Sequence, residues 1–85
     1  MAVFKEEEQR MMKNFQEVKK MLSPYLEKAK KFPIVEWVDL YVRDGRIVYA
    51  EGDGEIARII REENRDVSEE DLRYSTLVPM LLVVA

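Results

Sequence analysis

The amino-acid sequence predicts an α+β domain of residues 1–85 with the element order α-β-β-α-β. Three observations lead to this expectation. Two β-rich runs are joined by Asp44-Gly45, and this pair is favoured in tight hairpin turns because glycine readily adopts positive φ. Apolar residues with helical spacing occur both before and after these runs. The chain then ends on an apolar, β-rich segment, which predicts a third strand.

The predicted hairpin covers residues 35–50 and permits two registers. A two-residue loop places Leu40 opposite Tyr49, whereas a three-residue loop with a bulge at Gly45 places Leu40 opposite Val48. In either register, large apolar residues fall on both faces of the ribbon. A hairpin with one face in water would alternate polar and apolar residues. We therefore expect both faces to be covered, by helices of this chain or by another chain.

The first helix is predicted over residues 3–31, as a long amphipathic segment. Ser23-Pro24 either kinks it or divides it into helices over 3–22 and 24–31, and we favour the kink because the apolar stripe keeps its phase across the proline. Leu22 lies at the centre of this stripe, so its replacement by alanine should be strongly destabilising. The stripe consists of Met11, Phe15, Val18, Leu22, Tyr25, Ala29 and Phe32.

The second helix is predicted over residues 54–64, with Asp53 as its N-cap. Its buried stripe is expected to contain Ile56, Ala57, Ile59 and Ile60. Ser68 resembles a further N-cap that could begin one short helical turn. The terminal strand is predicted over residues 76–84. Because the second helix returns the chain, this strand should lie beside the first strand and antiparallel to it, in a three-stranded antiparallel sheet of order 2-1-3.

The composition excludes several kinds of chemistry. The chain has neither cysteine nor histidine, so disulfides, thiolate chemistry, the usual zinc ligands and the commonest general base are absent. Charged residues make up 36% of the chain with a net charge of only −3, a profile that resembles thermophile proteins. No stretch is long enough to span a membrane, and the early acidic residues are unlike a signal peptide. We expect a cytoplasmic protein.

Carboxylates occur in two loose groups that could carry chemistry. Asp44, Glu51, Asp53 and Glu55 lie on or near turns, but their spacing matches no calcium or magnesium template, and turn and cap roles explain them better. Glu36 and Asp39 could form an acid–base pair with Glu51, but their strand parity places them on opposite faces. We therefore expect no enzyme activity, no metal site and no cofactor.

A basic group on the second helix suggests an alternative function. Arg58, Arg61 and Arg65 could bind nucleic-acid phosphates, and Arg43 and Arg46 lie at the hairpin tip. Glutamates on the same helix offset much of this charge, and ion pairs within the helix are the simpler explanation. Nucleic-acid binding is therefore the second hypothesis.

Protein–protein interaction, including self-association as a homodimer, is the leading hypothesis. The hairpin is apolar on both faces, the first helix is longer than three strands can cover, and the terminal strand is expected at an apolar sheet edge. We expect Trp37 to be buried, in the monomer or at an interface. Leu82→Lys should give a soluble monomer or an unfolded chain. The candidate interface residues are Trp37, Tyr41, Val48, Met80, Leu82 and Val84.

Overall fold

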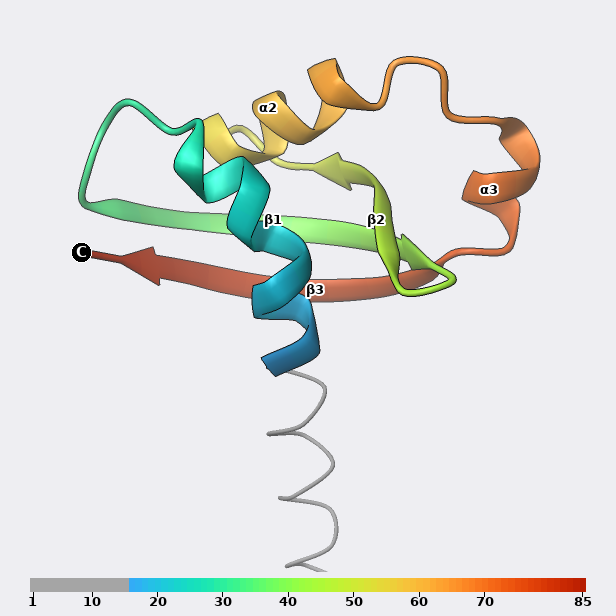
Figure 1. The fold of residues 1–85 in the computed structure, drawn as a ribbon, viewed down its shortest axis with the longest axis horizontal. Helices are drawn as coiled ribbons and strands as arrows, with labels where there is room; N and C mark the ends of the chain where they lie inside the picture. Colours follow the sequence, from blue (N-terminus) through green and yellow to red (C-terminus); the bar gives the residue numbers. More distant parts are fainter. Residues whose placement is uncertain (1–15) are drawn as a thin grey trace, which may run out of the picture.

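The computed structural model describes residues 16–85 and has the predicted α+β architecture (Figure 1). Its strands form one antiparallel sheet in the order β2-β1-β3, with the terminal strand beside the first, as the sequence predicts. In chain order, a helix over 16–27 precedes β1 (Ile34–Arg43), β2 (Arg46–Glu51), α2 (Glu55–Glu63), α3 (Glu69–Arg73) and β3 (Thr76–Val84).

The N-terminal helix is continuous through Pro24, so the prediction of two separate helices is excluded. The helix ends four residues before the predicted position 31, and its last turn closes with bonds from Lys28 N to Tyr25 O (3.1 Å) and from Ala29 N to Leu26 O (3.2 Å). These three-residue spacings are the tighter type common at helix ends. The predicted part over 3–15 lies outside the described residues.

The hairpin turn has the predicted two-residue loop. Asp44 (φ 51°) and Gly45 (φ 76°) both adopt positive φ, and Arg43 pairs with Arg46 across them. Two positive φ values match the twist of the flanking strands, which is why Asp-Gly suits this position.

The register of the two-residue loop, which places Val42 opposite Ile47, is confirmed at that pair. Beyond it both predicted registers are wrong, because the ladder between β1 and β2 shifts at a β-bulge. The pairing passes from Val42 with Ile47 to Tyr41 with Tyr49, so Val48 is an extra residue on β2. Leu40 consequently pairs with Ala50. The bulge places both Ile47 and Val48 in buried positions, an arrangement that simple alternation of faces does not produce.

The hydrophobic core lies between one face of the sheet and the helices. Figure 1 shows the N-terminal helix crossing in front of β1 and β3, with α2 beside β2. All four apolar residues predicted for the second helix are buried, and so are Val18 and Leu22 of the first. Phe32, by contrast, is exposed, because it follows the end of the helix. The core comprises Val18, Leu22, Ile34, Val38, Leu40, Ile47, Ala50, Ile56, Ala57, Ile59, Ile60 and Leu82.

Helix α2 is capped by a side chain from β1 and not by Asp53, which corrects the predicted cap. Its N-cap residue is Gly54, which has no side chain to accept a hydrogen bond. Glu36 instead accepts from Ile56 N (2.9 Å) and Ala57 N (3.5 Å). A Cβ atom on Gly54 would overlap the Glu36 carboxylate, so glycine at this position permits the cap. The capping interaction joins the helix directly to the central strand.

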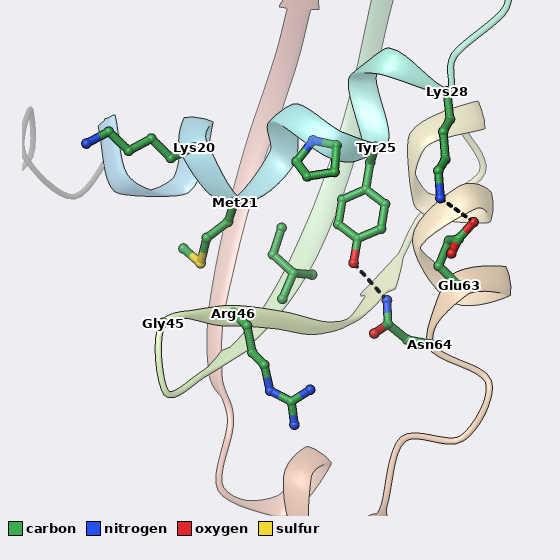
Figure 2. A pocket seen from close by; sticks show the side chains of 10 residues that line it. Lys20, Met21, Tyr25, Lys28, Gly45, Arg46, Glu63 and Asn64 are labelled. Atoms are coloured by element: carbon green, nitrogen blue, oxygen red, sulfur yellow. Dashed lines mark hydrogen bonds and ion pairs between the residues drawn. The ribbon is translucent and has the colours of Figure 1, made fainter.

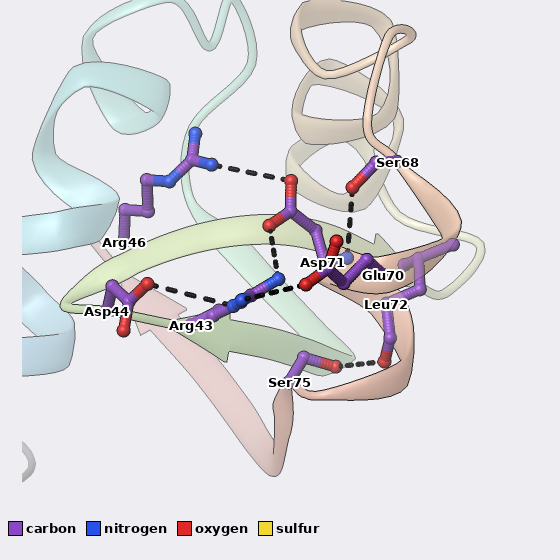
Figure 3. A network of polar contacts seen from close by, with 8 residues as sticks. All are labelled: Arg43, Asp44, Arg46, Ser68, Glu70, Asp71, Leu72 and Ser75. Carbon is purple, nitrogen blue, oxygen red and sulfur yellow. Dashed lines mark hydrogen bonds and ion pairs between the residues drawn. The ribbon is translucent and has the colours of Figure 1, made fainter.

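The short helix α3 begins as the sequence predicts. Ser68 Oγ accepts a hydrogen bond from Asp71 N (3.0 Å), the bond expected of an N-cap serine. Ion pairs then hold α3 against the hairpin tip: Asp71 accepts from Arg43 at 2.8 Å and lies 3.5 Å from Arg46 (Figure 3). The Arg43 guanidinium also lies 5.6 Å from the centre of the Tyr74 ring. These contacts position the chain for its entry into β3.

Candidate association surface

The face of the sheet opposite the helices carries five exposed apolar side chains, and we call this surface the open face. Its residues come from alternate positions of β1 and β3, which are neighbouring antiparallel strands. The exposed fractions are 67% for Val35, 73% for Trp37, 52% for Leu77, 42% for Leu81 and 68% for Val83.

Cross-strand register explains why these side chains gather. Val35 pairs with Val83, and Trp37 pairs with Leu81, so the four side chains form adjacent pairs on one face. Successive side chains of a strand point to opposite faces. The intervening residues of both strands therefore face the helices, while the open face has no element of the described chain over it.

Trp37 is not buried within the chain, so the monomer form of that prediction is wrong. The expectation relied on its apolar neighbours Val38 and Leu40, which do lie in the core. A strand covered on one face only leaves every second residue in water, and Trp37 occupies such a position. Burial of Trp37 at an interface stays a prediction.

The predicted interface residues divide between the two faces. Trp37 and the partly exposed Tyr41 belong to the open side. Val48 does not share their face, as the sequence argument assumed, because the bulge turns it inward. The remaining three lie on the helix side: Leu82 is a core residue, and Met80 and Val84 pack against the core. The alternate residues Leu77, Leu81 and Val83 were missed, although the β1–β3 register would have identified them.

Two acidic groups lie on the open side of the sheet: Asp39 of β1, which stands between the Trp37–Leu81 and Tyr41–Leu77 pairs, and Glu51 at the end of β2. Asp39 pairs with Glu51 across the two strands, and no ion pair is found for either carboxylate among residues 16–85. Tyr41 and Tyr49 lie beside them, with ring centroids 5.7 Å apart. Burial, followed by the charges of Glu51 and Asp39 and the neighbouring Tyr49, raises the pKa of Tyr41 above its ordinary value. The open side of the sheet thus combines apolar side chains with two carboxylates, and Asp39 lies among the apolar pairs.

The predicted basic face of α2 is largely occupied by contacts within the chain. Arg58 pairs with Glu62 at 3.1 Å, one helical turn away. Arg61 donates to two backbone carbonyls at the end of β2, Ala50 O (3.3 Å) and Gly52 O (3.0 Å). Arg65 is exposed. Two of the three arginines are therefore engaged within the chain, and the three do not form one basic surface for a phosphate backbone.

A groove of about 540 Å³ lies between the N-terminal helix, the hairpin tip and the end of α2 (Figure 2). Four of its polar side chains pair with each other: Lys28 pairs with Glu63 at 2.6 Å, and Asn64 donates to the Tyr25 hydroxyl at 3.0 Å. Across residues 16–85, no buried side-chain nitrogen or oxygen lacks a hydrogen-bond partner. The groove walls therefore connect the two helices and leave no unpaired buried group for a ligand.

The carboxylates of the predicted acid–base group divide between the two sides of the sheet. Glu36 faces α2, whereas Asp39 lies on the opposite side of the sheet, as their parity predicts. Glu55 accepts from Lys30 N at 2.7 Å. Over the described part of the chain, no group of three or more acidic residues is placed to hold a metal ion.

Comparisons with known proteins add no relative: no family model, curated protein or solved structure matches the chain. Among residues 16–85, no helix is long and apolar enough to cross a membrane.

Proposed function

We propose that this protein is a protein–protein association module and that the open face is its association surface. The observation that carries the proposal is Trp37, which is 73% exposed and surrounded by aliphatic side chains from two strands. Tryptophan is enriched among the residues that contribute most to binding energy at interfaces. A cytoplasmic location is part of the proposal, and it agrees with a chain that has no cysteine and therefore no disulfide, the bond typical of proteins in oxidising compartments.

The size of the open face also supports association. The exposed fractions of its five apolar residues correspond to roughly 600 Å² of accessible surface, the upper end of the largest apolar patch on a typical monomer. Exposing this much apolar surface in water is unfavourable unless a partner covers it. Neither catalysis nor nucleic-acid binding has a comparable observation in its favour, because Glu36 and Arg61 are committed to backbone groups.

Site-specific photo-cross-linking tests the proposal. A benzophenone amino acid replaces Val83, which lies beside Trp37 on the open face and contributes nothing to the core. The matched control carries the same amino acid at Ser23, which is exposed on the N-terminal helix. Irradiation of cells that produce each variant should give protein adducts at position 83 and not at position 23.

The adducts must also depend on the shape and chemistry of the open face. Adding Leu81→Lys to the position-83 variant should abolish them, because a charge in an apolar contact is costly to desolvate. Equal labelling at positions 83 and 23, or no adducts at position 83, would reject the association function.

A further inference from the structure

We infer that the occupant of the open face is a second copy of this chain, packed sheet against sheet around a two-fold axis. The inference rests on the proposed association function and names its partner. It assigns the contact to Val35, Trp37, Leu77, Leu81 and Val83, which differ from the helix-facing residues of the same strands.

The area of the open face suits a symmetric dimer. Complete burial of these residues on both copies would remove roughly 1,200 Å² of accessible surface, backbone included, which reaches the lower end of the range for stable specific interfaces. A two-fold contact is isologous, so one patch serves on both partners. The second copy thereby supplies the same area and needs no further surface feature.

The chemistry of the open face also suits another apolar sheet. Four of its five side chains are aliphatic, and Trp37 offers a single side-chain N–H donor. Two sheets can pack face to face at about 10 Å, with side chains from the inner faces interdigitating. The dimer would be a sandwich with the helices of each copy on its outside.

Face packing covers more of this surface than pairing of the β3 edges would. Joining two β3 strands edge to edge would extend the sheet but leave Trp37 and Val35 in water on an even larger apolar area. Pro79 also lies within β3 and has no backbone N–H, which limits the ladder that this edge can form. The edge is therefore the weaker site for a second copy.

The two carboxylates of the open side distinguish a second copy of this chain from a basic partner. In a two-fold contact that covers the open face, Asp39 of both copies lies within the contact and loses its hydration, because Asp39 stands between the apolar pairs of that face. Like charges at an interface oppose association. Asp39→Asn should therefore tighten a homodimer, whereas it would weaken binding to a basic partner.

Sedimentation equilibrium over about 1–100 µM protein measures the dissociation constant directly. We expect the wild type to reach twice the mass of one chain. Leu81→Lys and Val35→Lys should each weaken the dimer at least about thirtyfold, and Asp39→Asn should strengthen it at least about threefold. Ser23→Lys adds the same charge on the helix side and should leave the constant unchanged. Circular dichroism checks that each variant is folded, and Val35, which is 67% exposed and is not part of the core, is the safer position.

Two outcomes would overturn the inference. A wild-type monomer across the whole range excludes the second copy. A dimer insensitive to Val35→Lys must use another surface, such as the β3 edge. The cross-linking at Val83 separates these outcomes from failure of the association function, because adducts with a different protein would retain the function and exclude only the second copy.

Discussion

Replacement of Glu36 should show how far the fold depends on a single carboxylate. Glu36→Ala removes the acceptor for Ile56 N at 2.9 Å and for Ala57 N at 3.5 Å, together with a negative charge at the start of α2. Loss of a cap costs about 0.5–2 kcal/mol, and the charge near a helix N-terminus contributes about 0.3–1 kcal/mol. Because Glu36 is only partly buried, water compensates in part, and we expect a net loss of about 1–2 kcal/mol in the free energy of unfolding.

Urea denaturation followed by far-ultraviolet circular dichroism measures this loss, with all variants at one protein concentration because association would contribute to stability. Glu36→Gln keeps an acceptor oxygen and loses only the charge, so its cost should be about 0.3–1 kcal/mol. Glu27→Ala, an exposed glutamate at the end of the N-terminal helix, is the matched control and should remain within about 0.5 kcal/mol of wild type.

A double-mutant cycle with Gly54→Ala tests the geometry behind the prediction. In the wild-type background the added methyl group would displace the Glu36 carboxylate, so the substitution should be destabilising. In the Glu36→Ala background the overlap with the carboxylate is gone and only the close approach to the Cβ atom of residue 36, at 2.8 Å, remains, so the cost should fall by about 0.5 kcal/mol or more. Additive effects, or a Glu36→Ala variant as stable as Glu27→Ala, would refute the capping role.

Three other substitutions have defined outcomes. Leu22→Ala should cost about 2–5 kcal/mol in urea denaturation, because Leu22 is only 1% exposed and its removal leaves a cavity under the N-terminal helix; a loss no larger than that of Glu27→Ala would contradict the packing. Leu82→Lys should give an unfolded chain by circular dichroism, since it places an unpaired charge in the core, and a folded variant would show the position is misassigned. The raised pKa of Tyr41 means that the folded state keeps the phenol proton to higher pH than the unfolded state does. The contribution of Tyr41 to the free energy of unfolding is therefore complete below about pH 10 and is lost as the pH rises further. Tyr41→Phe should accordingly lose less stability than the wild type at alkaline pH.

The elements that local chemistry determines were predictable from the sequence. Asp44-Gly45 requires positive φ at two residues, and Ser68 caps α3 through its own side chain. The stripe of α2 repeats with helical spacing, and its apolar residues are all buried. Each of these patterns depends on neighbours within a few residues, so the sequence contains the whole interaction.

The cap of α2 was not predictable in the same way. Glu36 and Ile56 are separated by 20 positions, and only the packing of β1 against α2 brings them together. Sequence reasoning selected Asp53 because an N-cap is ordinarily local. A glycine pair around that aspartate, Gly52 and Gly54, was the available signal: Gly52 has φ +152°, and a Cβ there would lie 2.9 Å from Trp37 O. Glycines that allow such close approach indicate that another strand lies against the turn.

The residues of the open face could not be predicted from hydrophobicity alone, because hydrophobicity does not show which alternate positions of each strand face the helices. Apolar residues occur at both odd and even positions of β1 and β3, so the pattern does not state which set faces the helices. Glu36 is the informative exception, because it occupies a helix-facing position without contributing to the core and accepts two backbone hydrogen bonds there. Its role in capping α2 assigns the even positions to the helices and leaves the odd positions on the other side.

The residues at those odd positions are more hydrophobic than strand formation alone requires. Threonine would pack well on a half-exposed strand and would keep the face polar. The Val35–Val83 and Trp37–Leu81 pairs add only about 0.2–1 kcal/mol each to the sheet, far less than covering the roughly 600 Å² of accessible surface on these residues would contribute. Cross-strand pairing within one chain therefore uses only a small part of the free energy that burial of these side chains can contribute. The larger part of that free energy is gained only when another surface covers the side chains. For this reason the open face, and not the groove or the arginines of α2, carries the functional proposal.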